Sequence, residues 1–171
     1  MEVNESKLEV VRYREIVRQC EEKLRAQLQL AVAADQRAVS IATVFAALVS
    51  GVIAVYGALE AINEMSTAYR LGVGVSVAIW GYALTYVLST VKPALLGTPG
   101  GSLKDWEEDI AKNSSFEKSL ADVAEHMSAD ISDNEILLEE NGKTLWMGLK
   151  LGFAAPFFGI TAFIISKISV L

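Results

Sequence analysis

The chain has 171 residues, of which 52% are hydrophobic, and a formal net charge of −6. This length suits one domain, and its single cysteine, Cys20, excludes an internal disulfide. The acidic excess is concentrated in residues 92–143, which hold twelve acidic and five basic side chains. That segment is a poor partner for nucleic acid, whose phosphates need Lys and Arg.

Residues 1–37 predict a cytosolic amphipathic helix that continues into the membrane. Residues 6–9 read S-K-L-E, a capping box that predicts a helix start near residue 7. Apolar residues then follow the three-and-four spacing of a coiled-coil seam for about two heptads: Val10, Tyr13, Val17, Cys20 and Leu24. We expect this stripe to pack against the later acidic segment or against the same helix of a second copy.

Asp35 and Arg37 mark the point where this helix enters the membrane. They are two residues apart, so they do not face each other on a helix. Arg37 can reach the headgroups, whereas the charge of Asp35 is costly at this depth unless it is hydrated or paired. One interpretation is a polar boundary between helix and bilayer. The other is a polar contact that holds helices in register or lines a pore mouth.

Two uncharged runs, 38–59 and 71–91, predict a transmembrane hairpin. Each is long enough to cross a hydrocarbon core of about 30 Å as a helix. Small residues recur every four residues in the first run and at steps of three and four in the second, where they include Gly74 and Gly81. Such spacing lets helix backbones approach closely in lipid, so we expect packing faces there.

Residues 92–143 predict an acidic, cytosolic helical segment. Pro93 is expected to end the second span, and residues 97–101 read as a loop. A short helix is expected from Ser102, followed by a break at residues 113–115 and a longer amphipathic helix. Residues 132–135 offer another capping box, which predicts a further helix start.

Residues 144–167 predict a third transmembrane helix, with a re-entrant or interfacial helix as the alternative. Trp146 supplies an interfacial anchor, and Lys150 can extend its amine toward the boundary. Gly148 and Gly152 form a G-x-x-x-G motif for helix packing. Pro156 is expected to kink this helix, which neighbouring helices tolerate in a membrane.

The basic residues predict a cytosolic N-terminus, because they are concentrated before residue 38 and after residue 91. The fold class is therefore an all-α, multi-pass membrane protein: an N-terminal amphipathic helix, a transmembrane hairpin, a cytosolic helical segment and a C-terminal third span. A bacterial inner membrane is the expected location.

The usual sequence motifs of catalysis and cofactor binding are missing. There is no P-loop, no G-x-S-x-G and no dinucleotide fingerprint. With one histidine and one cysteine the usual nucleophile–base pairs cannot be built, and His126 alone is a poor metal candidate. We therefore expect a protein that is not an enzyme and has no cofactor, metal site or catalytic residue.

The layout resembles that of small bacterial anti-phage effectors, the Pycsar-type transmembrane effectors and the related SLATT-like modules. The matching features are the 34–38 stretch A-D-Q-R-A before the first span, the closely following second span, the exit at Pro93, and the acidic helical stretch before a closing span. The resemblance implies a nucleotide signal that triggers membrane disruption. Residues 92–143 are acidic where a phosphate would need positive charge, which argues against direct nucleotide sensing.

The sequence leads to two hypotheses of different classes. The first is a non-enzymatic, homo-oligomeric effector in the bilayer that permeabilises the inner membrane in response to a nucleotide signal or a protein partner at its cytosolic helices. The second is a structural or accessory membrane protein that binds a partner through those helices.

Overall fold

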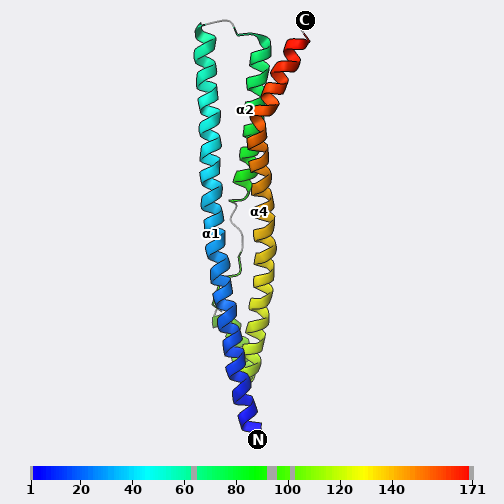
Figure 1. The fold of residues 1–171 in the computed structure, drawn as a ribbon. Coiled ribbons are helices and arrows are strands. Elements are labelled where there is room, and N and C mark those ends of the chain that lie inside the picture. Colours follow the sequence, from blue (N-terminus) through cyan, green and yellow to red (C-terminus); the bar gives the residue numbers. More distant parts are fainter. Residues whose placement is uncertain (1, 63–64, 92–95, 101–102, 170–171) are drawn as a thin grey trace. The chain divides into compact units, whose positions relative to one another are not determined.

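The computed structural model describes residues 2–62, 65–91, 96–100 and 103–169. Within them every regular element is a helix, in the order α1 (Glu2–Ile62), α2 (Thr67–Ser89), α3 (Leu103–Ala111) and α4 (Phe116–Ile168) (Figure 1). Helices α1, α2 and α4 are long and apolar enough to cross a membrane. The all-α class and the three candidate spans are thus confirmed.

Helix α1 is continuous over 61 residues, in agreement with the absence of Pro and Gly from residues 5–50. It begins at Glu2, so the predicted start near residue 7 is wrong. Ser6 lies within the helix, where the capping box has no helix start to serve.

Helix α4 is also continuous, over 53 residues. The predicted helix start at residues 132–135 is therefore wrong, and the acidic helix and the third apolar segment belong to one element. Asn134, read from the sequence as part of a cap, is instead 2% exposed. Because the sequence pattern for a cap is short, a buried polar residue within a helix can reproduce it.

Serine side chains stabilise the N-termini of α2 and α4. Ser66 is the N-cap of α2, with its Oγ accepting from the Tyr69 amide at 3.4 Å. Ser115 Oγ accepts from the Lys118 amide at 3.3 Å and so caps α4, as the predicted break at residues 113–115 requires. Residues 92–95, which include the predicted exit at Pro93, lie outside the described residues.

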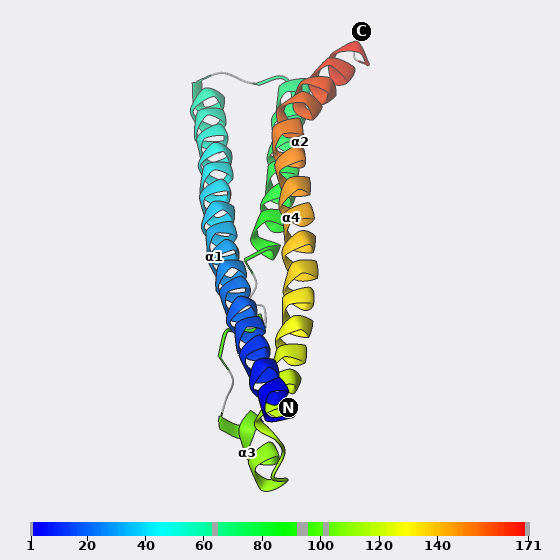
Figure 2. The ribbon, with the colours of Figure 1, turned by 60° about the horizontal axis from the view of Figure 1, so that its bottom comes forward.

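The chain divides into two compact units. We call Met1–Ala33 with Ala94–Glu139 the polar unit, and Ala34–Pro93 with Glu140–Leu171 the apolar unit. Helix α3 belongs to the polar unit (Figure 2).

In the polar unit, α1 and α4 pack through a small apolar core. Leu24 is fully buried against Met127 and Ile131, and Val17, Cys20 and Val123 lie around them. The cluster uses the predicted seam of α1, so the stripe packs against the later acidic segment of the same chain. Cys20 is half-buried in this cluster, as its helical spacing predicts.

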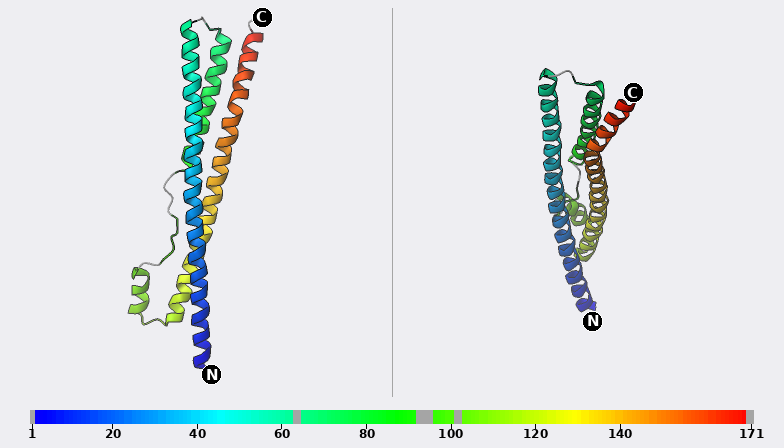
Figure 3. Two further views of the ribbon diagram at one scale, coloured as in Figure 1. Left: turned by 60° about the vertical axis from the view of Figure 1, so that its left-hand side comes forward. Right: turned by 45° about the horizontal axis from the view of Figure 1, so that its top comes forward.

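In the apolar unit, the core joins all three long helices (Figure 3). Ala38, Ala42 and Phe45 of α1 pack with Ala83 and Val87 of α2. Leu145, Leu149 and Leu151 of α4 cover this cluster.

The inward face of α4 follows a three-and-four spacing for 50 residues. Every position on that face is buried or half-buried, and the side chains become smaller along the helix. They are Glu117, Leu120, Ala124, Met127, Ile131, Asn134, Leu138, Asn141, Leu145, Gly148, Gly152, Ala155, Gly159, Ala162 and Ser166. This is a heptad seam.

Helices α1 and α4 run parallel within each unit and keep one register. In the polar unit Gln27 contacts Asn134, 107 residues further along. In the apolar unit the Cα of Gly152 faces the Phe45 ring, the same separation in sequence. The seam predicted for about two heptads therefore extends along α1 at least to Phe45.

Candidate functional site

The apolar unit contains a proline kink in α4 that is held by a hydrogen bond from α2. Pro156 has no amide N–H, so the carbonyl of Gly152, four residues earlier, has no partner within its own helix. Helix α4 bends in its last part, visible as its orange-to-red section (Figure 1), as the predicted kink requires. An orphaned carbonyl in an apolar setting costs free energy unless a donor reaches it.

Trp80 of α2 supplies that donor. Its Nε1–H donates to the Gly152 carbonyl oxygen at 2.8 Å, and the side chain is 8% exposed. One turn earlier on α2, Ser76 Oγ donates a longer bond of 3.4 Å to the Ala155 carbonyl oxygen. Two positions on one face of α2 thus reach two carbonyls at the kink, and we call this arrangement the Trp80 clasp.

The backbones of α2 and α4 approach closely beside the clasp. A Cβ at Gly72 would lie 2.8 Å from the Gly159 carbonyl oxygen, and one at Gly159 would lie 2.7 Å from the Gly72 carbonyl oxygen. Neither helix has space for a side chain there, because a main-chain oxygen obstructs each position and the Ser76 hydroxyl also obstructs Gly159. Gly72 and Gly159 thus let the two helices come within reach of the clasp.

Two cavities flank the clasp, and both lie between helices of the apolar unit. One, of about 410 Å³, is lined by Val52 of α1, by Gly72 and Ser76 of α2, and by Gly159 and Phe163 of α4, among others. The second, of about 360 Å³, lies between residues 40–48 of α1 and 149–156 of α4. Trp80 and Pro156 border both cavities, so space that no side chain fills adjoins the kink, beside the close contact of α2 and α4 at Gly72 and Gly159.

The predicted polar site at Asp35 and Arg37 lies on the surface of α1. Both side chains are exposed, and neither forms an ion pair with any residue that the structure describes. Their positions differ by about 200° around the helix, so they belong to different faces. The arrangement within one chain therefore leaves both charges available to water, headgroups or a partner.

The four glycines singled out from the sequence fall into two pairs. A Cβ at Gly148 would meet a Val87 methyl at 2.8 Å, and one at Gly152 would overlap the Phe45 ring. By contrast, added Cβ atoms at Gly74 and Gly81 would have nothing within 4 Å. Gly148 and Gly152 are thus needed for packing within one chain, whereas Gly74 and Gly81 lie on an open face of α2.

The polar unit has its own buried polar network, centred on Asn134. The Asn134 amide accepts from the Gly97 N–H at 3.0 Å and donates to the Gly97 carbonyl oxygen at 3.0 Å. It also donates to Gln27 Oε1 at 3.2 Å, and Gln27 Nε2 in turn donates to the Ile131 carbonyl oxygen at 3.0 Å. Among the described residues no buried side-chain nitrogen or oxygen lacks a partner.

This network fixes the segment after α2 to the α1–α4 pair of the polar unit. Only glycine fits at position 97, because a Cβ there would lie 2.5 Å from Asp130 Cβ. A polar pair at one layer of a coiled-coil seam specifies the register of its helices, since a shifted register would leave both amides unpaired.

Charged side chains on the surface of the polar unit have local partners. Hydrogen bonds from Arg18 and Gln19 lower the pKa of Glu15 to about 2. The Glu9 carboxyl, hydrogen-bonded to Glu117, raises the pKa of Glu117. Glu9 and Glu15 are exposed and Glu117 is half-buried, and these local partners organise the surface of the α1–α4 pair.

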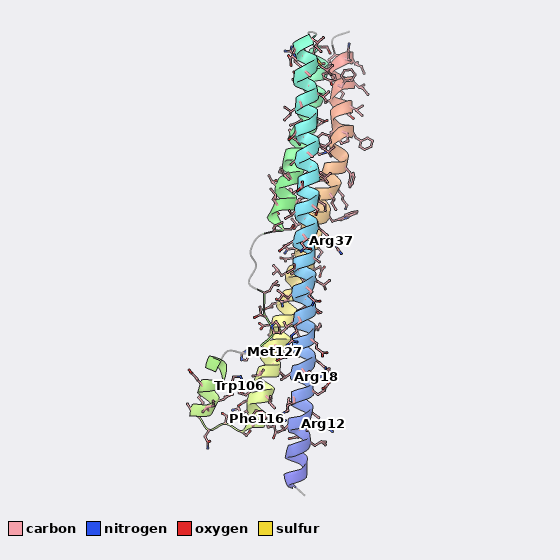
Figure 4. All side chains as sticks on the ribbon, turned by 90° about the vertical axis from the view of Figure 1, so that its left-hand side faces the viewer. Arg12, Arg18, Arg37, Trp106, Phe116 and Met127 are labelled. Atoms are coloured by element: carbon pink, nitrogen blue, oxygen red, sulfur yellow. The ribbon has the colours of Figure 1, made fainter. Side chains whose placement is uncertain are left out.

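An aromatic and cationic cluster lies where α3 turns into α4 (Figure 4). The rings of Trp106 and Phe116 are 6.3 Å apart between centroids at an angle of 23°. The guanidinium of Arg14, on α1, lies 5.3 Å from the centroid of the Phe116 ring. Stacking and cation–π attraction hold this end of the polar unit together.

The described residues contain no group of three or more His, Cys, Asp or Glu side chains placed to hold a metal ion. The clasp pairs an indole donor with a main-chain acceptor and has no nucleophile–base pair. What it does is position α2 against α4. Pro156, Gly148 and Gly152 were identifiable from the sequence. The role of Trp80 was not, because its partner is a main-chain atom 72 residues away.

Comparisons with protein-family models, with curated proteins and with solved structures found no match.

Proposed function

We propose that this protein is a non-enzymatic effector of the bacterial inner membrane that works as a homo-oligomer. In this proposal a signal at the polar unit makes the spans of the apolar unit repack and the membrane lose its barrier. The site provides contacts between helices rather than reacting groups, which suits such a role.

The observation that supports the proposal is the loose packing around the Trp80 clasp. A kinked span with empty space on each side of the kink can repack there without first displacing other side chains. Proline kinks and small-residue contacts between spans involve modest energies. Rotation of α4 about its kink would exchange one set of weak contacts for another.

The open face of α2 supports self-association. Gly74 and Gly81 have empty space beside them in one chain, and Ala78 and Thr85 on the same side are exposed. In a bilayer such a face suits close approach to a helix of a second copy. We expect Gly81→Leu to reduce oligomer formation, measured by size-exclusion chromatography with light scattering in detergent, while Gly51→Leu on α1 does not. Monomeric wild-type protein at every concentration would contradict the homo-oligomer.

The proposal also requires a defined topology, with the N-terminus in the cytosol and three spans. Alkaline phosphatase fused after Leu171 should then be active, and the same enzyme fused after Lys112 should not. Activity of the Lys112 fusion would place the polar unit outside and overturn this topology.

Membrane depolarisation tests the function directly. We expect induced expression to depolarise bacterial cells that carry a potential-sensitive dye. Trp80→Phe keeps the ring but removes the donor at the kink, so it should lower the expression level at which depolarisation begins. Glu140→Gln, an exposed change on α4, is the matched control and should leave that level unchanged.

The effector and the accessory protein predict different results in this assay. If the wild-type chain never depolarises cells, even when expressed with the genes beside it, the effector proposal fails and partner binding becomes the better explanation. If Asp35→Ala or Arg37→Ala abolishes depolarisation while the protein stays in the membrane fraction, the charged boundary takes part in the effect.

A further inference from the structure

The cavity between α1 and α4 is apolar along its length and polar at one end. Its walls are formed by Val44, Phe45 and Leu48 on α1, by Leu149 and Phe153 on α4, and by Trp80. Ser40 is the first α1 residue that lines it, and its hydroxyl donates to the Gln36 carbonyl oxygen, one turn back in the same helix. The walls therefore offer no polar group that a water-soluble ligand would need inside the cavity.

Arg37 is a cation on the same face of α1 as residues that line this cavity, and it lies beyond the end of the cavity at Ser40. Arg37 precedes Ser40, Val44 and Leu48 by three, seven and eleven residues, which places all four on one face of the helix. Helical side chains lean toward the N-terminus of their helix, so Arg37 extends away from the apolar walls. Arg37 is exposed (Figure 4), and Asp35 belongs to a different face of α1.

A second cation and an aromatic ring come from α4. Trp146 precedes Leu149 by three residues and Phe153 by seven, and so shares their face. The ammonium of Lys150 lies 5.3 Å from the centroid of the Trp146 ring. Because α4 runs parallel to α1 in the apolar unit, Trp146 and Lys150 extend toward the same end of the cavity as Arg37.

We propose that this cavity binds one acyl chain of an anionic phospholipid, whose phosphate is held between Arg37 and Lys150. The inference rests on membrane insertion of the apolar unit and not on the effector function. A guanidinium matches two phosphate oxygens with a pair of parallel hydrogen bonds. Aromatic side chains favour the headgroup region of a bilayer, so the Trp146 indole would mark the depth of the phosphate beside Lys150. The apolar walls thus define the acyl chain of the bound lipid, and the two cations define its headgroup.

Bromine on a lipid acyl chain quenches tryptophan fluorescence at short range. Quenching of Trp80, which lines the cavity, would therefore report that an acyl chain lies beside the cavity wall. We would reconstitute the full-length chain with Trp106→Phe and Trp146→Phe, so that Trp80 is the only tryptophan and a ring remains beneath Lys150. The probes are brominated phosphatidylglycerol in a phosphatidylcholine vesicle and, in the reverse arrangement, brominated phosphatidylcholine in a phosphatidylglycerol vesicle.

At equal mole fraction we expect phosphatidylglycerol to associate with the Trp80 site about fivefold more strongly than phosphatidylcholine, the scale of attraction per surface cation. Arg37→Gln or Lys150→Gln should each remove most of that preference. Arg25→Gln, which changes an exposed arginine of α1 in the polar unit, should leave it unchanged. Val44→Phe, which narrows the cavity, should reduce quenching by both lipids.

Three other outcomes would overturn the proposal, and each would contradict a different part of it. Equal quenching by the two lipids would mean that the cations do not select the headgroup. Unchanged quenching in Val44→Phe would mean that the chain does not enter the cavity. Absence of quenching by either lipid would remove the site together with the membrane insertion on which it rests.

Discussion

The inward face of α4 carries mainly large side chains in the polar unit and mainly small ones in the apolar unit. In the polar unit Leu24 packs against Met127 and Ile131. In the apolar unit α4 presents Gly148 and Gly152, against which Val87 and Phe45 pack directly. Both arrangements use the same heptad spacing and the same 107-residue register.

The difference is the one expected if the polar unit folds in water and the apolar unit in a bilayer. In water, burial of large apolar side chains provides the driving force, at roughly 25 cal/mol per Å². Between helices in lipid that force is absent, so close backbone approach and dispersion take its place. Polar groups differ accordingly: the polar unit buries a side-chain amide pair, whereas the apolar unit uses side-chain donors to complete the main chain at a kink.

The largest effect is expected where the apolar unit has no space. Gly159→Ala should destabilise that unit by about 3 kcal/mol, the upper end for overpacking, because the Ser76 hydroxyl and the Gly72 carbonyl oxygen both obstruct the added methyl. The measurement is thermal unfolding in detergent, followed by circular dichroism. Gly81→Ala has open space and should be neutral or stabilising by up to about 1 kcal/mol. Equal effects of the two substitutions would contradict close backbone packing.

The amide network of the polar unit should give the next largest effect. Asn134→Leu leaves Gln27 Oε1 and the Gly97 main chain unpaired and should cost about 1–3 kcal/mol in thermal unfolding. Gln27→Leu combined with Asn134→Leu should recover part of that loss, since two apolar residues then meet in the seam. Strict additivity of the two single changes would show that the amides do not act as a pair.

The Trp80 bond of the clasp should contribute less, because it is one hydrogen bond. Trp80→Phe should destabilise the chain by about 0.5–1.5 kcal/mol. Pro156→Ala restores an amide N–H for the Gly152 carbonyl, so in that background the same tryptophan change should have a smaller effect. A double-mutant cycle in detergent measures this coupling. If Trp80→Phe costs the same in both backgrounds, the indole is not compensating for the proline.

The smallest effects concern exposed charges of the polar unit, and the two carboxyls should behave oppositely. Glu15 has a pKa of about 2 instead of 4.5, so its contribution is present above the unfolded value and is lost as the pH falls toward 2. The pKa of Glu117 is raised, which means that the folded state holds this proton more tightly than the unfolded chain. The stability of the polar unit should therefore fall as the pH rises from the ordinary pKa of a glutamate to the raised one. Carboxyl carbon NMR of Arg18→Gln should show the Glu15 pKa returning toward 4.5, and an unchanged pKa would contradict the role of Arg18.

Sequence alone determined the all-α class, the three apolar segments, the seam of α1 and the packing glycines of α4. These features are periodic or compositional, and a repeat of three and four residues or an uncharged run of 22 residues has few structural meanings. Short patterns were less informative. The capping boxes at residues 6–9 and 132–135 fit the motif, but both lie inside helices, because long-range packing continued each helix through them.

Tertiary structure alone decided which faces meet. The small residues of α2 at positions 74, 78 and 81 follow the spacing of a packing face, yet they are exposed, and α2 turns Gly72, Ser76 and Trp80 toward α4 instead. Two faces of one helix can each satisfy the small-residue pattern, so spacing cannot choose between them. The choice depends on a main-chain carbonyl that Pro156 leaves unpaired 72 residues from its donor. That relation exists only once α2 and α4 are packed together.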